Sequence, residues 1–543
     1  MKNKHERIIF PAQDLKKVSR YADEGYFRDE TLSTWLVRNA KESTTSPAII
    51  SSSASVSHEE LLQKVSALAY GLQTMGLGKG DVIAVQLPNT PEFIYSYLAI
   101  ASIGAIMQTL HMPYRESELE YLLNDSRATA VICLSEFKNF SPALTVLDVC
   151  TNTGIDSRVI SIGDNIDGTV NFNDLLLESN DIRPELVQTD DLFLLLYTSG
   201  TTSSPKGVPH RYNNFLTNAR LCGNDYGFSS SARLLSLAPM THLYGLFTLN
   251  MTLSLTASTI LLPAFSPDAF VGTVKEQKPS AIFAAPAHFA TCFQQDLLTK
   301  DDFESVRFVC LSGSTVSPQL AEQVDDLLVN GKVGQLWGMS ELQAGAITRM
   351  DDSKSVRCNS SGQATTGSEL RIVDGKGKPL PANNEGELQV RGLSVFDGYL
   401  NKAEETAKVF TEDSWFCTGD LALQDDMGNL KITGRTKNLI NRGGVKYNPI
   451  EIENIINKLE AVSQCAVIPN EDANLGEIAC IFVVVDKAVT ISLKEICSVL
   501  DSENIAKYKW PEQIHIIESM PMTPTNKVKL EDLSELLSVG KNV

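Results

Sequence analysis

The chain has 543 residues, and at roughly 150 residues per domain this length predicts about three to four domain-sized units. Lys and Arg number 47 and Asp and Glu number 66, so the formal net charge is −19. A charge of this sign repels phosphate backbones and anionic lipid surfaces, which excludes nucleic acid as an expected partner but still permits a local basic site for one anion. Hydrophobic residues make up 43% and charged residues 21%, which excludes a largely disordered chain.

The cysteines and histidines are scattered. None of the ten cysteines forms a CxxC pair, and the seven histidines include no HExxH motif, so we expect reduced, mostly buried thiols and no protein-ligated zinc or iron. The amino terminus has no apolar core of the kind found in secretory signals, so the cytoplasm is the expected compartment. Two apolar stretches, Phe93–Leu110 and Leu246–Phe265, are interrupted by polar residues or glycine. They are predicted to be buried core segments rather than membrane spans.

The first two thirds of the chain alternate between helical and strand-like patterns. Apolar residues recur at helical spacing over Leu61–Met75, the turn GLGKGD follows, and Val82–Leu87 is a strand-like run. Further strand-like runs are Ala130–Leu134, Leu192–Tyr197, Ala281–Ala285 and Phe308–Leu311. This alternation predicts α/β layers with largely parallel sheets.

The pattern changes after about Ser368. Short strand-like pieces separated by turn sequences predict a β-rich subdomain; they are Leu370–Val373, Glu387–Val390 and Leu430–Ile432. From Tyr447 onward a small unit is predicted, with helices at Ile450–Leu459 and Leu493–Leu500, strands near Cys465–Ile468 and Ala479–Val485, and then a polar tail. This α+β unit has its own core pattern and is a candidate independent lid domain.

One segment after a predicted strand is rich in hydroxyls and small residues. TSGTTSSPKG, residues 198–207, follows Leu192–Tyr197 and precedes a helix-compatible stretch from Arg211. Hydroxyls, free backbone N–H groups and one lysine between a strand and a helix can cradle a phosphate, although the spacing is not that of the GxxxxGK[ST] loop. By itself the segment fits a solvated turn equally well.

Together with four further motifs, this segment resembles the superfamily of adenylate-forming enzymes, which includes acyl-CoA synthetases, aryl-acid ligases, luciferases and peptide-synthetase adenylation domains. Tyr197–Gly207 is similar to the family's phosphate loop, YTSGTTGxPKG, with Ser203 in place of one glycine. WGMSE, residues 337–341, resembles the family's YGxTE motif, whose aromatic residue lies against adenine and whose glutamate helps to hold magnesium. Such roles suit a flat ring and a carboxylate.

The remaining three motifs lie further along the chain, so that the resemblance covers roughly residues 30 to 530. TGD, residues 418–420, contains the aspartate that binds the ribose hydroxyls in the family. GRTKNLINRGG, residues 434–444, is similar to the hinge motif, and PMTPTNKVKL, residues 521–530, resembles the segment that carries the catalytic lysine. Ser203, Asn438 and Asn526 depart from the family pattern, and each could slow turnover.

The resemblance implies an organisation and a set of site residues. It implies a large N-terminal adenylation domain over residues 1–436, made of layered α/β subdomains plus a β-rich subdomain, and a mobile α+β lid over residues 437–543. The implied catalytic residues are Lys527, Glu341, His242 and Arg435, with Glu341 as the magnesium ligand. The implied nucleotide-binding residues are Thr198, Ser199, Gly200, Thr201, Thr202, Lys206, Ser314, Trp337, Gly338, Met339, Ser340, Asp420 and Arg435. Lys437, Gly443 and Gly444 would form the hinge and the channel for a pantetheine thiol.

The implied reaction has two halves, which use ATP, Mg²⁺ and a thiol. A carboxylate attacks the α-phosphorus of ATP to give an acyl-adenylate, and a thiol then displaces AMP. CoA is the expected thiol, and the phosphopantetheine of a carrier protein is the alternative. A non-catalytic acyl- or nucleotide-binding protein is a third reading, against which the retained charged residues argue. A luciferase-type oxidation would share all of these motifs.

The acid is constrained by what the pocket segment lacks. PMTHLYG, residues 239–245, has no aspartate for an amino-acid ammonium and resembles the acyl-CoA synthetase form. An aliphatic, alicyclic or aryl acid of medium size is therefore expected, and Tyr21–Leu36 resembles aryl-acid and cyclohexanecarboxylate ligases. The predicted pocket residues are His242, Leu243, Gly313, Ser314, Met339 and Ala344. A monomer or homodimer without an integral membrane segment is expected.

Overall fold

The computed structural model describes residues 8–52, 54–176, 187–198, 205–443, 445–459, 461–472, 474–485, 490–523 and 528–540, without the side chains of residues 446 and 538–540. Two compact units are present. The first contains residues up to 198, 205–369 and 391–411, and the second contains residues 370–390 and the described residues from 412 onward. The predicted boundary between an adenylation domain, residues 1–436, and a mobile lid, residues 437–543, concerns movement rather than compactness. It stays a prediction.

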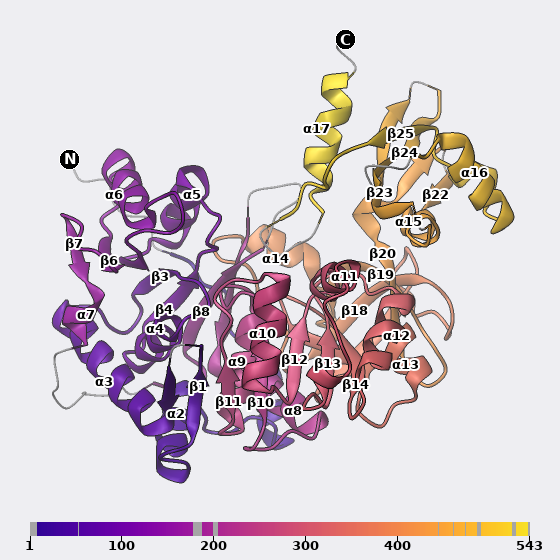
Figure 1. Ribbon diagram of the computed structural model, residues 1–543. Coiled ribbons are helices and arrows are strands. Elements are labelled where there is room, and N and C mark those ends of the chain that lie inside the picture. The colour runs from indigo at the N-terminus through magenta and orange to yellow at the C-terminus, as the bar shows by residue number, and fades with distance from the viewer. Residues whose placement is uncertain are drawn as a thin grey trace. The chain divides into compact units, whose positions relative to one another are not determined.

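The first unit contains two sheets with mostly parallel strands (Figure 1). The nine-stranded sheet has the order β16-β15-β14-β13-β12-β10-β11-β1-β2. Its strands are β1 (Pro47–Ile50), β2 (Ser55–Ser57), β10 (Arg233–Ser236), β11 (Ser258–Ile260), β12 (Ala281–Ala284), β13 (Phe308–Leu311), β14 (Lys332–Met339), β15 (Gln343–Ile347) and β16 (Gln363–Ala364). Strands β11, β10, β12, β13 and β14 pair in parallel, whereas β2, β15 and β16 pair antiparallel at the two ends.

The seven-stranded sheet has the order β7-β6-β5-β3-β4-β8-β9. Its strands are β3 (Val82–Gln86), β4 (Ile106–Thr109), β5 (Ala130–Leu134), β6 (Arg158–Ile162), β7 (Thr169–Asn171), β8 (Leu192–Tyr197) and β9 (Gly207–Arg211). All pairs are parallel except β8 with β9. The α/β class with largely parallel sheets, predicted from the alternating pattern, is confirmed.

Helices separate most of these strands along the chain. They are α1 (Leu15–Asp23), α2 (Leu32–Glu42), α3 (His58–Thr74), α4 (Pro91–Ser102), α5 (Glu116–Ser126), α6 (Pro142–Thr153), α7 (Phe172–Leu175), α8 (Tyr212–Asp225), α9 (Leu243–Ser254), α10 (Pro267–Gln277), α11 (Pro286–Gln294), α12 (Pro318–Leu327), α13 (Lys354–Asn359) and α14 (Ala403–Val409), with one 3₁₀ turn at Asp301–Phe303. Five of these helices begin with proline, which suits the first turn because its missing N–H has no intrahelical partner there. Ser57 and Glu60 form a capping box that starts α3.

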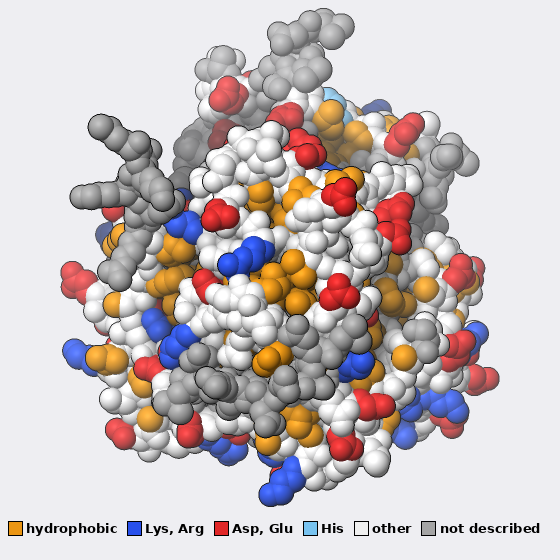
Figure 2. All heavy atoms as spheres, turned by 90° about the vertical axis from the view of Figure 1, so that its left-hand side faces the viewer, with side chains coloured by type: hydrophobic (Ala, Val, Ile, Leu, Met, Phe, Trp, Pro, Cys, Tyr) orange, Lys and Arg blue, Asp and Glu red, His pale blue; other side chains and the backbone are white. Residues whose placement is uncertain are grey.

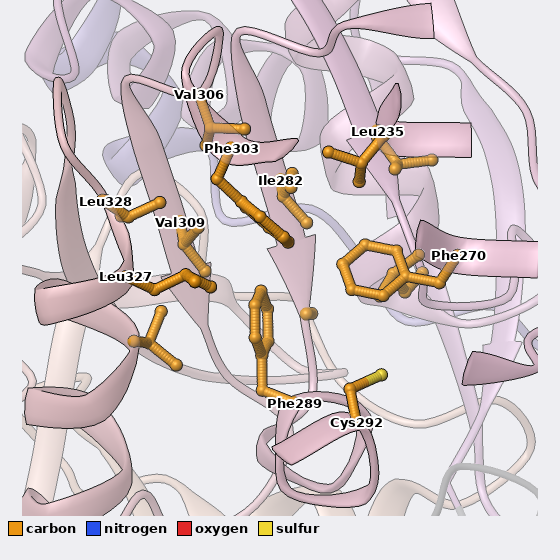
Figure 3. Close-up of a cluster of buried hydrophobic side chains, with 14 of the residues drawn as sticks. Leu235, Phe270, Ile282, Phe289, Cys292, Phe303, Val306, Val309, Leu327 and Leu328 are labelled. Carbon is orange, nitrogen blue, oxygen red and sulfur yellow. The ribbon is translucent and has the colours of Figure 1, made fainter. Parts of the chain in front are cut away.

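The core beside the nine-stranded sheet is built from aliphatic and aromatic side chains. Figure 3 shows Phe270, Phe289 and Phe303 from the helical layer facing Ile282 and Val309 on β12 and β13. All five are fully buried. Such packing anchors β12 and β13, whose carboxyl ends lead into candidate site loops.

The two apolar stretches that were considered as possible membrane spans, Phe93–Leu110 and Leu246–Phe265, belong to this unit. Every residue of α4 from Phe93 to Ser102 is buried, and α9 is buried from Leu243 to Leu253. Within the described ranges, no helix is long and apolar enough to cross a membrane. The two stretches are core segments, as predicted.

On the face drawn in Figure 2, acidic and basic side chains are interspersed with hydrophobic ones.

The second unit contains a four-stranded sheet with the order β17-β18-β19-β20 and a five-stranded sheet with the order β22-β21-β24-β23, in which β25 pairs with β24. Their strands are β17 (Ser368–Val373), β18 (Gly386–Gly392), β19 (Phe416–Gln424), β20 (Leu430–Arg435), β21 (Ile440–Arg442), β22 (Val445–Tyr447), β23 (Val462–Asp472), β24 (Gly476–Val485) and β25 (Gln513–Ile516). The helices are α15 (Ile450–Ile456), α16 (Leu493–Ser502) and α17 (Leu530–Gly540), and 3₁₀ turns lie at Thr436–Asn438 and Lys507–Lys509. The predicted polar tail is wrong, because it contains β25 and α17.

A partly buried acid in this unit should make the stability of the unit depend on pH. Glu453 on α15 accepts a hydrogen bond from the backbone N–H of Val467 at 2.7 Å, and burial raises the pKa of its carboxyl to about 7. The native state therefore favours the protonated acid. Stability from this group is complete below the ordinary pKa of 4.5 and is lost as the pH rises through 7.

We expect Glu453→Gln to be more stable than the natural chain at pH 8, by on the order of 1 kcal/mol, because the amide cannot ionise. Thermal denaturation at pH 5 and pH 8 measures the difference, which should shrink at the lower pH. The matched control is Glu451→Gln on the same helix, where the carboxylate pairs with Lys509 and is half exposed. A Glu453→Gln effect that is equal at both pH values contradicts the expectation.

Candidate active site

The predicted phosphate loop begins and ends on paired strands. The N–H of Thr198 donates to the carbonyl of Lys206 at 3.0 Å, and the N–H of Lys206 donates to Thr198 Oγ1 at 3.1 Å. The segment thus connects β8 to the antiparallel strand β9, which the sequence analysis did not predict. Helix α8 begins at Tyr212, next to the predicted start of the helix-compatible stretch at Arg211. Of the predicted loop residues, Ser199, Gly200, Thr201 and Thr202 lie outside the described residues.

Lys206 and Glu341, predicted to serve the same phosphate site, both contact Tyr399. The Lys206 Nζ lies 4.7 Å from the centroid of the Tyr399 ring. The Tyr399 hydroxyl donates to Glu341 Oε1 at 3.0 Å. Burial and the neighbouring carboxylate raise the pKa of Tyr399 far above its usual value, so the phenol keeps its proton and acts as a donor at neutral pH. The arrangement brings a cation and a carboxylate to one aromatic side chain.

The WGMSE motif forms the end of β14 and the turn into β15. A Cβ on Gly345 would come within 2.4 Å of Trp337 Cζ3, so this glycine lets the β15 backbone approach the indole ring. A Cβ on Gly338 would come within 1.7 Å of the Gln343 carbonyl oxygen. Trp337 is largely buried, while Met339 and Ser340 are half-buried. The hairpin therefore holds the aromatic ring rigidly and places Glu341 in the following turn.

The predicted pocket histidine lies where strand ends from the two sheets meet. His242 precedes α9, and its Nδ1 accepts from the Tyr244 N–H at 3.3 Å. Thr241 Oγ1 is 2.9 Å from His111 Nδ1, and His111 follows β4 of the other sheet. The ring centroids of His111 and His242 are 6.2 Å apart. Burial lowers the pKa of His111 to about 4, so it is neutral at physiological pH.

Asn89, which follows β3, makes a second connection between the two sheets. Its Nδ2 donates to the carbonyl of Ala238 at 3.0 Å, and its Oδ1 accepts from the N–H of Met240 at 2.7 Å. This buried amide fixes the backbone just before His242. The carboxyl ends of parallel strands are the usual place for ligands in α/β proteins, so the location suits a substrate site.

The other predicted pocket residues differ in exposure. Gly313 has φ +93° in the turn after β13, and Ser314 beside it is exposed. Leu243 is buried, and Ala344 is buried at 1% exposure, with its backbone bound to the Asn218 amide at 3.0 and 3.1 Å. Their contact with an acid stays a prediction.

In the second unit, Asp420 and Arg435 lie opposite each other on β19 and β20. Arg435 Nε donates to Asp420 Oδ1 at 2.7 Å. Asp420 is 4% exposed, and Gly419 before it has φ +71°. Lys437 is exposed in the 3₁₀ turn after β20, and Gly443 has φ +58° with its N–H donating to the Leu475 carbonyl at 2.6 Å. Gly444 and Lys527 lie outside the described residues.

Three of these contact residues were not singled out from the sequence: Tyr399, His111 and Asn89. Asn89 and His111 follow apolar strands, so the rule that parallel strands present polar residues at their carboxyl ends could have found them. Tyr399 carries no such signal, because its partner Glu341 is 58 positions away in the chain.

The fold is that of an α/β enzyme with two parallel-stranded sheets and a separate C-terminal unit. The chain belongs to the AMP-binding enzyme family, because residues 36–400 match that family and residues 451–527 match the AMP-binding enzyme C-terminal domain. The predicted family and fold class are thus confirmed.

Named relatives agree with this assignment. The chain is 29% identical over 520 residues to the medium-chain fatty-acid–CoA ligase of Escherichia coli K12, covering 94% of this chain and 91% of that one. It is 27% identical over 533 residues to a salicylyl-CoA synthase / salicylate adenylyltransferase of Streptomyces, covering 95% and 96%. The ATP-bound structure of MatB from Rhodopseudomonas palustris has a TM-score of 0.84 at 27% identity, covering 92% of this chain and 98% of that chain. These names agree with the predicted enzyme class, an acid–thiol ligase.

Proposed function

We propose that the chain is an AMP-forming acyl-CoA synthetase that activates a medium-sized apolar carboxylic acid with ATP and transfers the acyl group to CoA. The observation that supports this most is that two charged residues contact Tyr399: Lys206, at the end of the β8–β9 loop, and Glu341. The chain that makes these contacts belongs to the AMP-binding family. The proposed setting is the cytoplasm, with the enzyme acting as a monomer or homodimer on a small-molecule acid.

The first half-reaction requires alignment rather than a protein nucleophile, because the substrate carboxylate is itself the nucleophile. In this proposal Thr198 to Thr202 and Lys206 bind the phosphates, and the hydroxyl of Ser340 also meets phosphate. Trp337, with the neighbouring Gly338 and Met339, borders the adenine. Asp420 accepts from the ribose hydroxyls, and Arg435 orients Asp420 and contacts the nucleotide. Lys527 stabilises the oxygens that gain negative charge.

The residues present are compatible with magnesium. Among the described residues, no group of three or more His, Cys, Asp and Glu side chains could hold a metal by itself. Mg²⁺ usually takes one or two carboxylates and completes its shell with substrate phosphates and water, so a single buried carboxylate fits it. Glu341 has one oxygen bonded to Tyr399 and is the proposed ligand. Bound Mg²⁺ would neutralise charge on the phosphates.

The acid is proposed to lie near His242 at the carboxyl ends of β10 and β13. Leu243, Gly313, Ser314 and Ala344 are the other proposed neighbours. Both a fatty acid and an aryl acid are compatible with this set, as in the names of the two relatives. The second half-reaction is assigned to a movement of residues 437–543 about Lys437, which brings Gly443 and Gly444 to the thiol channel.

The test is acid-dependent ATP–pyrophosphate exchange across fatty, alicyclic, aryl and amino acids. We expect one apolar acid class to support exchange and amino acids to fail. The active acid is then incubated with ATP and either CoA or a phosphopantetheine-bearing carrier protein, and thioester formation is measured. Preference for the carrier would replace the CoA proposal, and ATP binding without exchange for any acid would favour a non-catalytic protein.

A further inference from the structure

The segment 395–401, here named the clasp, joins two parts of the candidate nucleotide site within the first unit. The N–H of Phe396 donates to the backbone carbonyl of Glu341 at 2.7 Å. The N–H of Leu400 donates to the carbonyl of Gly207 at 2.9 Å. Gly207 directly follows Lys206, so the clasp is bonded both to the end of the phosphate loop and to the turn that carries the carboxylate.

Tyr399 lies between these two backbone anchors and contacts both charged groups. Its ring faces the ammonium of Lys206, a cation–π contact, and its hydroxyl donates to the carboxylate of Glu341. The T-shaped contact with Phe396, at 4.9 Å between centroids, fixes the ring further. Tyr399 and Glu341 are 6% and 5% exposed, so little water competes with their hydrogen bond. The Tyr399 side chain therefore helps to position both the Lys206 ammonium and the Glu341 carboxylate.

Two ion pairs that share the buried side chain of Asp397 connect the clasp to Lys17 and Arg211. Asp397 accepts from Lys17 Nζ at 2.8 Å and from Arg211 Nε at 3.0 Å. Lys17 Nζ also donates to the Val395 carbonyl at 2.7 Å. Burial would raise the pKa of Asp397, but the two cations hold it below its usual value. Its side chain is 6% exposed, so removing one cation would leave a buried charge with less compensation.

Backbone bonds extend the same connection. The N–H of Ile9 donates to Asn401 Oδ1 at 2.9 Å, and the N–H of Asn401 donates to the Ile9 carbonyl at 3.0 Å. Arg211 Nη2 donates to the carbonyl of Pro11 at 3.2 Å. Residues 9–17 thus hold both ends of the clasp, although none of them belongs to a motif of the nucleotide site.

We propose that Tyr399 is a positioning residue that holds the Glu341 carboxylate for magnesium-bound nucleotide, and that Lys17 keeps Tyr399 in place through Asp397 and the clasp. The proposal rests on the assignment of ATP and magnesium to this site. Because Glu341 has other oxygen lone pairs, the Tyr399 hydrogen bond orients the carboxylate without using up its capacity for a cation.

Calorimetric titration of the full chain with ATP, with Mg²⁺ and with EDTA in its place, tests Tyr399. In Tyr399→Phe the ring stays beneath Lys206 while the hydroxyl is lost. We expect metal-free ATP binding within about threefold of the natural chain, and a loss of about tenfold in the magnesium-dependent tightening. Tyr399→Leu removes the ring as well and should also weaken metal-free binding.

The matched control is Tyr121→Phe, because the Tyr121 hydroxyl donates to the Pro205 carbonyl at 2.9 Å beside the same loop. It should keep the natural magnesium effect. A Tyr399→Phe protein with the natural magnesium effect overturns the proposal, and so does a natural chain whose ATP binding ignores magnesium. No acid is needed in these titrations, so a failure of the proposed acid ligase activity would appear separately, in the exchange assay.

A double-mutant cycle tests the role of Lys17. Lys17→Met should reduce the magnesium effect about threefold, and the Lys17→Met/Tyr399→Phe double variant should be no worse than Tyr399→Phe alone, because both changes act through one hydroxyl. Thermal melts verify that each variant is folded at the assay temperature. Additive losses in the double variant overturn the connection from Lys17 to Tyr399.

Discussion

Lys527→Ala should lose adenylation by on the order of 10²- to 10³-fold, the usual cost of removing a preorganised donor from a site of developing negative charge. The phosphates and the attacking carboxylate are all anionic, and the proposed role of the Lys527 ammonium is to stabilise the oxygens between them. The measurement is acid-dependent ATP–pyrophosphate exchange with the acid found active in the panel.

The control for this variant lies two positions away. Lys529 Nζ lies 3.4 Å from Asp532 in an exposed pair, and such pairs contribute little. Lys529→Ala removes the same charge from the same segment, and we expect exchange close to that of the natural chain. If Lys527→Ala exchanges within about threefold of the natural chain, or if both variants lose activity equally, the assignment of Lys527 is wrong.

The sequence predicted the buried strands well, because a strand inside a parallel sheet is apolar along its whole length. Ala130–Leu134, Leu192–Tyr197 and Phe308–Leu311 have the predicted bounds. Strand β9 was missed because Gly207–Arg211 contains Pro209, His210 and Arg211, and only its pairing with β8 makes it a strand.

The missed helix α17 has a different explanation. Leu530, Leu533 and Leu537 recur at helical spacing, with acidic and polar residues between them. Leu533 and Leu537 are buried against Phe482 and other residues of β23 and β24. Tertiary packing therefore stabilises this helix, and such packing cannot be predicted from local composition.

In the candidate site, too, local sequence patterns identified some residues and missed those that depend on tertiary contacts. The motifs named Lys206, Trp337 and Glu341 because each stands in a short contiguous pattern. They could not name Tyr399 or Asp397, whose partners lie far away in the chain. Physical reasoning from single motifs finds the groups that meet a ligand, whereas the residues that hold those groups become visible only when distant segments are brought together.

Lys437→Pro should separate the two half-reactions. Lys437 is exposed in the 3₁₀ turn Thr436–Asn438, between β20 and the residues proposed to move. Hinges act through changes in φ and ψ, and proline fixes φ near −65° and also restricts the residue before it. Rotation about this position should therefore be hindered while the acid and ATP sites stay intact.

We expect the rate of thioester formation to fall by about tenfold or more, while ATP–pyrophosphate exchange stays within about threefold. Thioester formation is measured in a single turnover that starts from enzyme-bound acyl-adenylate. Lys437→Ala keeps the backbone free and should therefore leave thioester formation faster than Lys437→Pro does. Equal losses in both half-reactions would mean that Lys437 is not the hinge, because a fixed φ at a residue outside the moving joint has no reason to affect one half-reaction more than the other.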